Sequence, residues 1–178
     1  MPDVSRLFPS INAQPMSDRR IIQRFVNAWA ASSRGSFPTW RQLRSIDLGS
    51  DWNWVYMVDL ERSVGYPHFE FLGARLSELA EVYLAGGGEW AVSVLDKVAD
   101  DINAAVREQG PNLREDSLVL EDGRALLVRC MTAPLSSEGE GMGAKITKVA
   151  GVVSGRLAEL GEIAFGPVND DSSLGGET

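Results

Sequence analysis

The stretch from Trp52 to Leu76 constrains the fold more than any other part of the chain, because large apolar and polar side chains alternate along it. Successive side chains of a strand point to opposite faces of a sheet. One parity of the first half therefore predicts a bulky apolar face: Trp52, Trp54, Tyr56, Val58 and Leu60. A turn segment that contains Gly and Pro (61–67) follows, and the chain extends again over 68–73 with Phe69 and Phe71 on one face. The stretch predicts an antiparallel hairpin with one face on a core.

Helical spacing predicts an N-terminal helix that begins at Asp18, as its N-cap, and ends near Ser32. Its apolar side chains form one stripe, which includes Ile21, Ile22, Phe25 and Trp29. A stripe of this kind packs either on its own domain or on a second copy of the chain, and the sequence leaves both interpretations open. Under the second interpretation these four residues are the dimerisation surface.

Three further segments have helical character. Thr39 opens a short helix before the hairpin, and Ser77 is the expected cap of a helix that stops at the glycine run 86–88. That run lacks the spacing of a phosphate-binding or dinucleotide-binding loop, so we interpret it as a break between helices. From Glu89 to Gln109 an apolar residue recurs every fourth position, beginning at Trp90 and Val94. This segment predicts the longest helix of the chain.

Three extended segments follow, at 112–120, 125–132 and 145–154, and an Asp-Gly turn joins the first two. The order of elements predicts an α+β domain. It has a five-stranded antiparallel sheet with helices on one face, plus an N-terminal amphipathic helix. We divide the chain into a flexible N-terminus (1–17), the N-terminal helix (18–36), the domain (37–160) and an acidic disordered tail (161–178).

Charge and composition restrict the class of partner. A net charge of −8 argues against a general nucleic-acid binder and against attraction to anionic membranes. No apolar run is long enough to cross a bilayer, and the N-terminus lacks the apolar core of a secretory signal. The single cysteine, Cys130, has no internal disulfide partner. We therefore expect a cytoplasmic protein.

Four short segments of the sequence resemble those of a family of small bacterial PAS-domain proteins. The resemblance lies in IDLGSDW (46–52), VYMVDLE (55–61), FEFLGARL (69–76) and PLSSEGEGMGAKITKVAGVV (134–153). It extends over residues 37–156. The resemblance implies a PAS-like fold, a role in sensing or protein–protein interaction, and dimerisation through an N-terminal helix.

No residue set predicts catalysis, a metal site or a cofactor. A haem-binding PAS domain usually carries its axial histidine on the long helix, whereas His68 lies on the hairpin. The Asn-Cys-Arg motif of photoactive flavin-binding PAS domains is absent around Cys130, which we interpret as an inert buried or half-buried thiol. We expect no cofactor.

Six large side chains are the candidate ligand-binding residues: Trp54, Tyr56, Phe69, Phe71, Trp90 and Val94. They line a pocket for a small apolar ligand or interlock as a solid core, and the sequence favours the core.

Two functions remain open. The first is a stand-alone PAS-type sensory or regulatory module, which works as a homodimer or through another protein and has no enzyme activity. The second is a small cone-shaped enzyme, similar to a steroid isomerase, which uses a buried carboxylate at Glu70 or Asp59. We prefer the first, because the second shape usually begins with long helices before a curved sheet.

Overall fold

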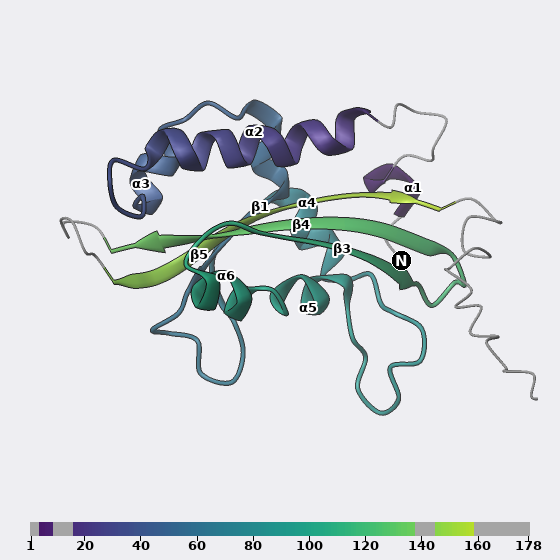
Figure 1. The fold of residues 1–178 in the computed structure, drawn as a ribbon. Coiled ribbons are helices and arrows are strands. Elements are labelled where there is room, and N and C mark those ends of the chain that lie inside the picture. Colours follow the sequence, from purple (N-terminus) through teal and green to yellow (C-terminus); the bar gives the residue numbers. More distant parts are fainter. Residues whose placement is uncertain (1–3, 9–15, 138–144, 159–178) are drawn as a thin grey trace, which may run out of the picture.

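The computed structural model describes residues 4–8, 16–137 and 145–158. They form an α+β domain around a five-stranded antiparallel sheet with the order β2-β1-β5-β4-β3 (Figure 1). The strands are β1 (Val55–Asp59), β2 (His68–Leu72), β3 (Asn112–Val119), β4 (Ala125–Ser136) and β5 (Ile146–Leu157). The helices are α1 (Val4–Leu7), α2 (Met16–Ser32), α3 (Trp40–Arg44), the 3-10 helix η1 (Gly49–Trp54), α4 (Ala74–Leu79), α5 (Val94–Ala99) and α6 (Ile102–Glu108). The predicted fold class is confirmed.

Helices cover both faces of the sheet. α2 and α3 lie on one side, here the outer face, and α5 and α6 lie on the other, the inner face (Figure 1). The interior strand β1 is consequently buried at all five positions, with Val55 and Met57 in the outer core and Tyr56 and Val58 in the inner core. The alternation of side chains along β1 therefore separates two apolar cores, whereas the sequence predicted a core on one face of the hairpin.

The predicted hairpin exists, but its aromatic side chains divide between the two cores. Trp52 and Trp54 belong to η1 and not to the strand, so their parity with Tyr56 has no meaning. The pairing of β1 with β2 is irregular between Met57 and Val58. Met57 pairs with Phe71 but Val58 pairs with Phe69, which leaves one extra residue in β2. A bulge of one residue reverses the faces beyond it. The prediction that Phe69 and Phe71 share a face was therefore wrong.

The prediction of one long helix over Glu89–Gln109 was also wrong. Ser93 and Asp96 form a capping box that starts α5, and a second short helix, α6, follows it. The segment before Ser93 is a loop whose base is closed by the Leu84 amide, which donates to the Val92 carbonyl at 2.8 Å. Trp90 lies in this loop with 81% of its side chain exposed. The apolar repeat continues across a real helix start, and periodicity alone does not reveal that start.

The first helix after the hairpin begins earlier than predicted. α4 starts at Ala74, directly after Gly73, so Ser77 lies inside the helix and does not cap it. A Cβ atom on Gly73 would lie 2.3 Å from the Asn53 carbonyl oxygen, so only glycine fits between β2 and η1. Thr39, in contrast, caps α3 as predicted, through a capping box with Gln42.

Part of the N-terminal segment is packed, against the expectation of a flexible N-terminus. α1 places Leu7 and Phe8 in the inner core cluster, and the Phe8 ring lies next to Gly155. α2 begins at Met16, two residues before the predicted cap, and ends at Ser32 as expected. The predicted acidic tail (161–178) lies outside the described residues. None of the described helices has the length and apolar character that a membrane span requires.

Candidate functional site

The centre of the inner face is filled by Tyr56. Its side chain is fully buried, and its ring lies over Gly151 of β5, where a Cβ atom would come within 2.3 Å of Tyr56 Cζ. The Tyr56 and Thr132 hydroxyl groups are 2.8 Å apart and form a buried hydrogen bond. Burial raises the pKa of Tyr56 far above its ordinary value, so the phenol stays protonated. This pair occupies the middle of the space between the sheet and the inner helices.

Cys130 lies beside this pair on β4 and is buried. Burial, followed by the nearby Asp101 carboxylate, raises the pKa of the thiol to about 12. A thiol with such a pKa is neither a good nucleophile nor a ready metal ligand at neutral pH. The geometry therefore agrees with an inert thiol.

An ion-pair cluster joins the inner helices to the sheet, and sequence reasoning missed it. The Arg114 guanidinium on β3 lies 2.7 Å from Asp101 and 2.8 Å from Asp116, and it donates to the Lys97 carbonyl at 2.6 Å. Burial raises the pKa of Asp101, although Arg114 opposes that shift. The cluster positions α5 and α6 on β3, because each donor direction of the guanidinium has an acceptor on a different segment.

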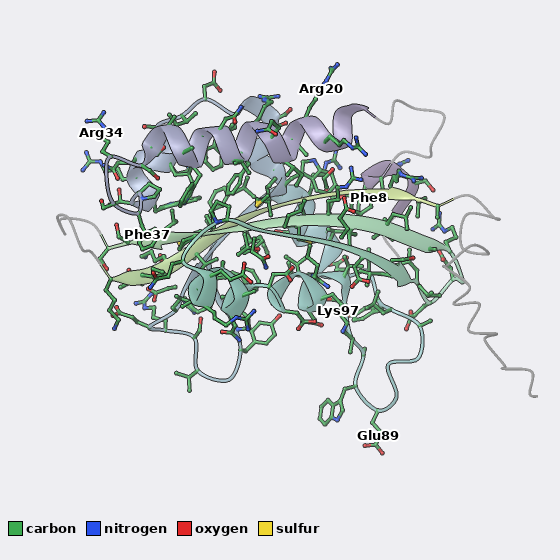
Figure 2. The ribbon with its side chains drawn as sticks, in the orientation of Figure 1. Phe8, Arg20, Arg34, Phe37, Glu89 and Lys97 are labelled. Carbon is green, nitrogen blue, oxygen red and sulfur yellow. The ribbon has the colours of Figure 1, made fainter. Side chains whose placement is uncertain are left out.

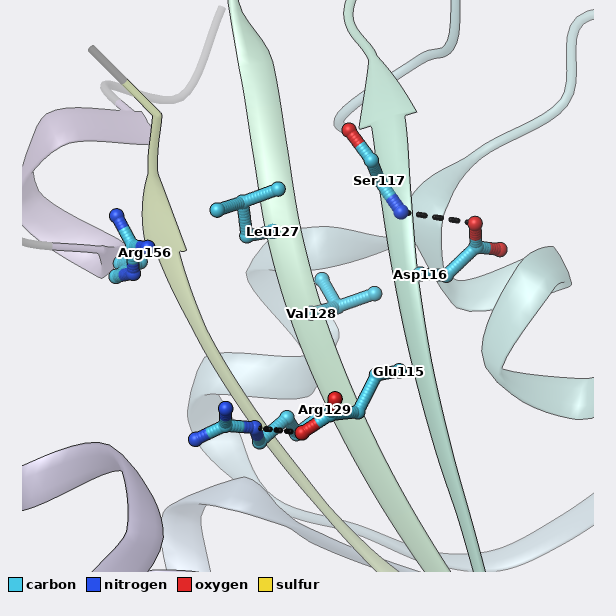
Figure 3. A pocket seen from close by; sticks show the side chains of 7 residues that line it. All are labelled: Glu115, Asp116, Ser117, Leu127, Val128, Arg129 and Arg156. Atoms are coloured by element: carbon cyan, nitrogen blue, oxygen red, sulfur yellow. Dashed lines mark hydrogen bonds and ion pairs between the residues drawn. The ribbon is translucent and has the colours of Figure 1, made fainter. Parts of the chain in front are cut away.

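A shallow depression lies on the opposite, outer face, over the part of β3, β4 and β5 shown in Figure 3. Its volume is about 350 Å³. Figure 3 shows Leu127 and Arg129 from β4, with Arg129 paired to Glu115 on the neighbouring strand. The lining is Glu115, Asp116, Ser117, Leu127, Val128, Arg129 and Arg156. Arg129 and Glu115 form a cross-strand ion pair here, an arrangement that stabilises the pairing of β3 with β4.

The predicted ligand-binding residues do not form one pocket. Tyr56 and Phe69 meet in the inner core, with ring centroids 5.9 Å apart, and Val94 is buried in the same cluster. Phe71 packs in the outer core against Trp40, at 5.2 Å. Trp90 is solvent-exposed on its loop. The sequence favoured a core over a pocket for these residues, and the bulge in β2 and the break before α5 distribute them between two cores and an exposed loop.

Trp54 contacts Phe8, with ring centroids 5.2 Å apart, and lines a second depression between α1, η1 and β5. Asp51 and Arg75 also line it. The buried Asp51 oxygen faces Arg24 of α2 at 3.0 Å, so this ion pair joins the middle of α2 to η1. Burial raises the pKa of Asp51 in spite of that arginine.

The two carboxylates considered for catalysis have structural partners. The Asp59 carboxylate accepts hydrogen bonds from the backbone amides of Glu61 and Arg62, at 2.9 and 3.2 Å, and thereby closes the turn after β1. Its pKa lies below the ordinary value, because these hydrogen bonds and Lys148 outweigh the effect of burial. Glu70 pairs with Lys148 and is exposed. A general base would need the opposite, a raised pKa inside a pocket.

The stripe on α2 faces its own sheet. Phe25 is 1% exposed and Ile22 is buried in the outer core, while Ile21 and Trp29 pack against the same cluster. The indole NH of Trp29 donates to the Pro134 carbonyl at 2.8 Å. A second copy does not reach Ile22 or Phe25 unless the helix leaves the sheet. The stripe therefore packs within the domain, which is one of the two interpretations that the sequence left open, and dimerisation through it stays a prediction.

His68 is the first residue of β2 and is exposed. It pairs with Asp59 at the turn end of the hairpin. Within the described ranges, no three His, Cys, Asp or Glu side chains are grouped closely enough to hold a metal ion.

Comparisons with known proteins add little to this geometry. No protein-family model matches the chain, and no curated protein is similar to it. Among solved structures, the PAS domain of a protein from Colwellia psychrerythraea aligns with 58% of this chain and 86% of its own length, at 16% identity and a TM-score of 0.30. That TM-score is too low to support an inference about fold or function, so none rests on this likeness.

Proposed function

We propose that this chain is a PAS-type regulatory module that works through protein contacts and has no enzyme activity of its own. The observation that carries the proposal is the filled inner face. Tyr56 occupies the position over Gly151 and its hydroxyl is satisfied by Thr132, so the space between sheet and helices is taken by the protein's own side chains. The strand order and the sequence resemblance supply the regulatory class.

The surface supports contact with proteins. Val64 and Trp90 are 89% and 81% exposed, on two loops that extend from the inner side of the domain (Figure 1). Exposed aromatic side chains are enriched where protein interfaces have their strongest contacts. A steroid-isomerase-like enzyme finds no comparable support, because Asp59 and Glu70 both have ion-pair partners.

The test is affinity capture from the lysate of the source cells, with the wild-type chain compared with the V64S/W90S double variant. Both side chains are exposed, so the variant keeps the fold, which circular dichroism checks. The proposal predicts a partner that the wild type retains in stoichiometric amount and the double variant loses. Identical recoveries with both chains contradict it, as does a small molecule bound in the inner core of the wild type.

A further inference from the structure

The exposed side of α2 and α3 carries arginine and no acidic side chain. Residues 19–46 contain six arginines and no Asp, Glu or Lys, and all six arginines are exposed: Arg19, Arg20, Arg24, Arg34, Arg41 and Arg44. They belong to α2, α3 and the connection between the two helices. Figure 2 shows Arg20 and Arg34 on the side of α2 that is turned away from the sheet. We name these six residues the arginine surface.

The arginine surface differs from the rest of the chain in its shortage of ion pairs. Elsewhere, eight basic side chains each form an ion pair with a carboxylate: Arg62, Arg75, Lys97, Arg107, Arg114, Arg124, Arg129 and Lys148. Within the described ranges the arginine surface has one ion pair, between Arg24 and Asp51 at 3.0 Å. Arg44 lies over the Trp52 ring, 4.3 Å from its centroid. In the described part of the chain the side chains of the other four arginines form neither an ion pair nor a hydrogen bond.

A lack of acidic residues does not explain this shortage. The chain has 25 Asp and Glu against 17 Lys and Arg, so the residues outside 19–46 have a net charge of −14, the difference between −8 and +6. Arg20 and Arg24 are four positions apart on α2, a spacing at which like charges destabilise a helix. Unpaired like charges of this kind do not stabilise the isolated domain. A partner with the opposite charge would account for their position.

The side chains between the arginines allow close approach along α2. The other exposed positions of this helix from Arg19 onward are Gln23, Asn27, Ala30 and Ala31. The two alanines are short, and packed helices approach to about 8–10 Å between their axes where the side chains allow it. α2 has 17 residues, which corresponds to a length of about 25 Å. A helix laid along it would meet Arg20 near one end and Arg34 at the other.

We propose that the arginine surface docks an acidic helix of a partner protein, which lies along α2. Guanidinium groups bind carboxylates through paired N–H donors, and these four unpaired side chains have their donors available. A nucleic-acid duplex or an anionic membrane fits less well, because each extends far beyond α2 and meets the net charge of −14 on the rest of the chain. The inference goes beyond the proposed function, since the arginine surface contains neither Val64 nor Trp90.

The test is fluorescence anisotropy of a labelled helical peptide of about 20 residues, titrated with the full chain. The peptide has Glu at every fourth position and Ala elsewhere, and a second peptide has Gln in place of each Glu. We expect the Glu peptide to bind at about 50 mM NaCl and to lose affinity about tenfold or more at about 500 mM, where exposed charges are screened. The Gln peptide should not bind. Equal binding of the two peptides, or binding of neither, overturns the proposal.

Two matched variants separate local contact from net charge. R20E/R34E reverses one charge toward each end of α2, and neither side chain has a partner to lose in the described ranges, so the fold should persist, which circular dichroism checks. R62E/R107E is the control, because it also changes the net charge from −8 to −12, at exposed arginines outside α2 and α3. We expect R20E/R34E to weaken binding of the Glu peptide about tenfold or more, and R62E/R107E to change it by less than about twofold. Equal losses in the two variants overturn docking on the arginine surface.

Three further titrations identify the surface and the class of partner. V64S/W90S should bind the Glu peptide as the wild type does; a loss in this variant places the peptide on the loops and overturns the inference, while the proposed function stands. A duplex of about 20 base pairs and vesicles that contain phosphatidylserine should bind more weakly than the Glu peptide. Tighter binding of either one, lost in R20E/R34E, overturns the assignment to an acidic helix.

Discussion

Substitution of Gly151 by Ala tests whether Tyr56 fills the inner face. The new Cβ atom would lie 2.3 Å from Tyr56 Cζ and 2.4 Å from its Cε1 and hydroxyl oxygen, about 1 Å closer than an ordinary contact. The ring has no free space, because it is fully buried and its hydroxyl is bonded to Thr132. Overpacking of a core costs about 1–3 kcal/mol. Replacement of Gly by Ala also lowers the backbone entropy of the unfolded chain, which stabilises the fold by about 0.4–1 kcal/mol.

The net expectation for G151A is a loss of about 1.3 kcal/mol in the free energy of unfolding, from about 2 kcal/mol of overpacking less about 0.7 kcal/mol from the unfolded chain. The sign should change in a Tyr56→Leu background. Tyr56→Leu alone destabilises the fold, because it leaves a cavity over β5. In that background the methyl group added by G151A enters free space, and the substitution should be neutral or stabilising by up to about 1 kcal/mol.

Urea unfolding of the four chains of this double-mutant cycle, followed by tryptophan fluorescence, gives the coupling energy. G110A is the matched control, because a Cβ atom there meets nothing closer than the Glu108 carbonyl oxygen at 3.9 Å. A G151A variant as stable as the wild type, or an equal loss in both backgrounds, refutes the reasoning. Either result places the Tyr56 ring away from Gly151.

Three further predictions concern stability. In T132V the buried Tyr56 hydroxyl loses its hydrogen-bond partner, so the free energy of unfolding should fall by about 1–3 kcal/mol. The double variant Y56F/T132V should lose much less, because neither polar group remains. Equal losses for the two variants in urea titrations would contradict the buried hydrogen bond. The pKa of Cys130 is raised from 9.0 to about 12 in the folded chain, so its contribution is complete below pH 9 and is lost as the pH rises toward 12, by about 1.4 kcal/mol per pH unit. Urea midpoints at pH 8 to 10 should therefore fall less steeply in C130A than in the wild type, and parallel profiles would exclude a buried thiol. F25A should lower the free energy of unfolding by about 3–5 kcal/mol, because Phe25 is buried between α2 and the sheet. W90A should change it by less than about 0.5 kcal/mol, because Trp90 is exposed. Similar losses for the two variants in thermal unfolding would contradict the packing of α2.

Local signals identified much of the fold. Thr39 and the Asp122-Gly123 turn have the expected roles, since the residues that cap a helix or turn a hairpin act over three or four positions. The register within the hairpin was not visible in the same way. Whether Phe69 and Phe71 share a face depends on a bulge that forms against β1, and β1 is fixed by its pairing with β5.

The elements around the Trp90 loop show a different limit. Ser93 and Asp96 have the spacing of a capping box, and this signal marks the true start of α5 within a longer apolar repeat. Arg114, Asp116 and Leu118 share one parity of β3, so their common face could be predicted. The ion pair of Arg114 with Asp101 could not be predicted, because Asp101 lies at the junction of two short helices that only tertiary packing defines.

Native mass spectrometry of the chain purified from its source cells, combined with an absorbance spectrum, tests the central claim most directly. The account predicts that every species has the mass of the polypeptide alone or an integral multiple of it. It also predicts that absorbance above 300 nm is absent, because the protein's own side chains occupy the inner face. A small molecule bound in stoichiometric amount, and lost with Tyr56→Trp but not with W90S, would contradict it.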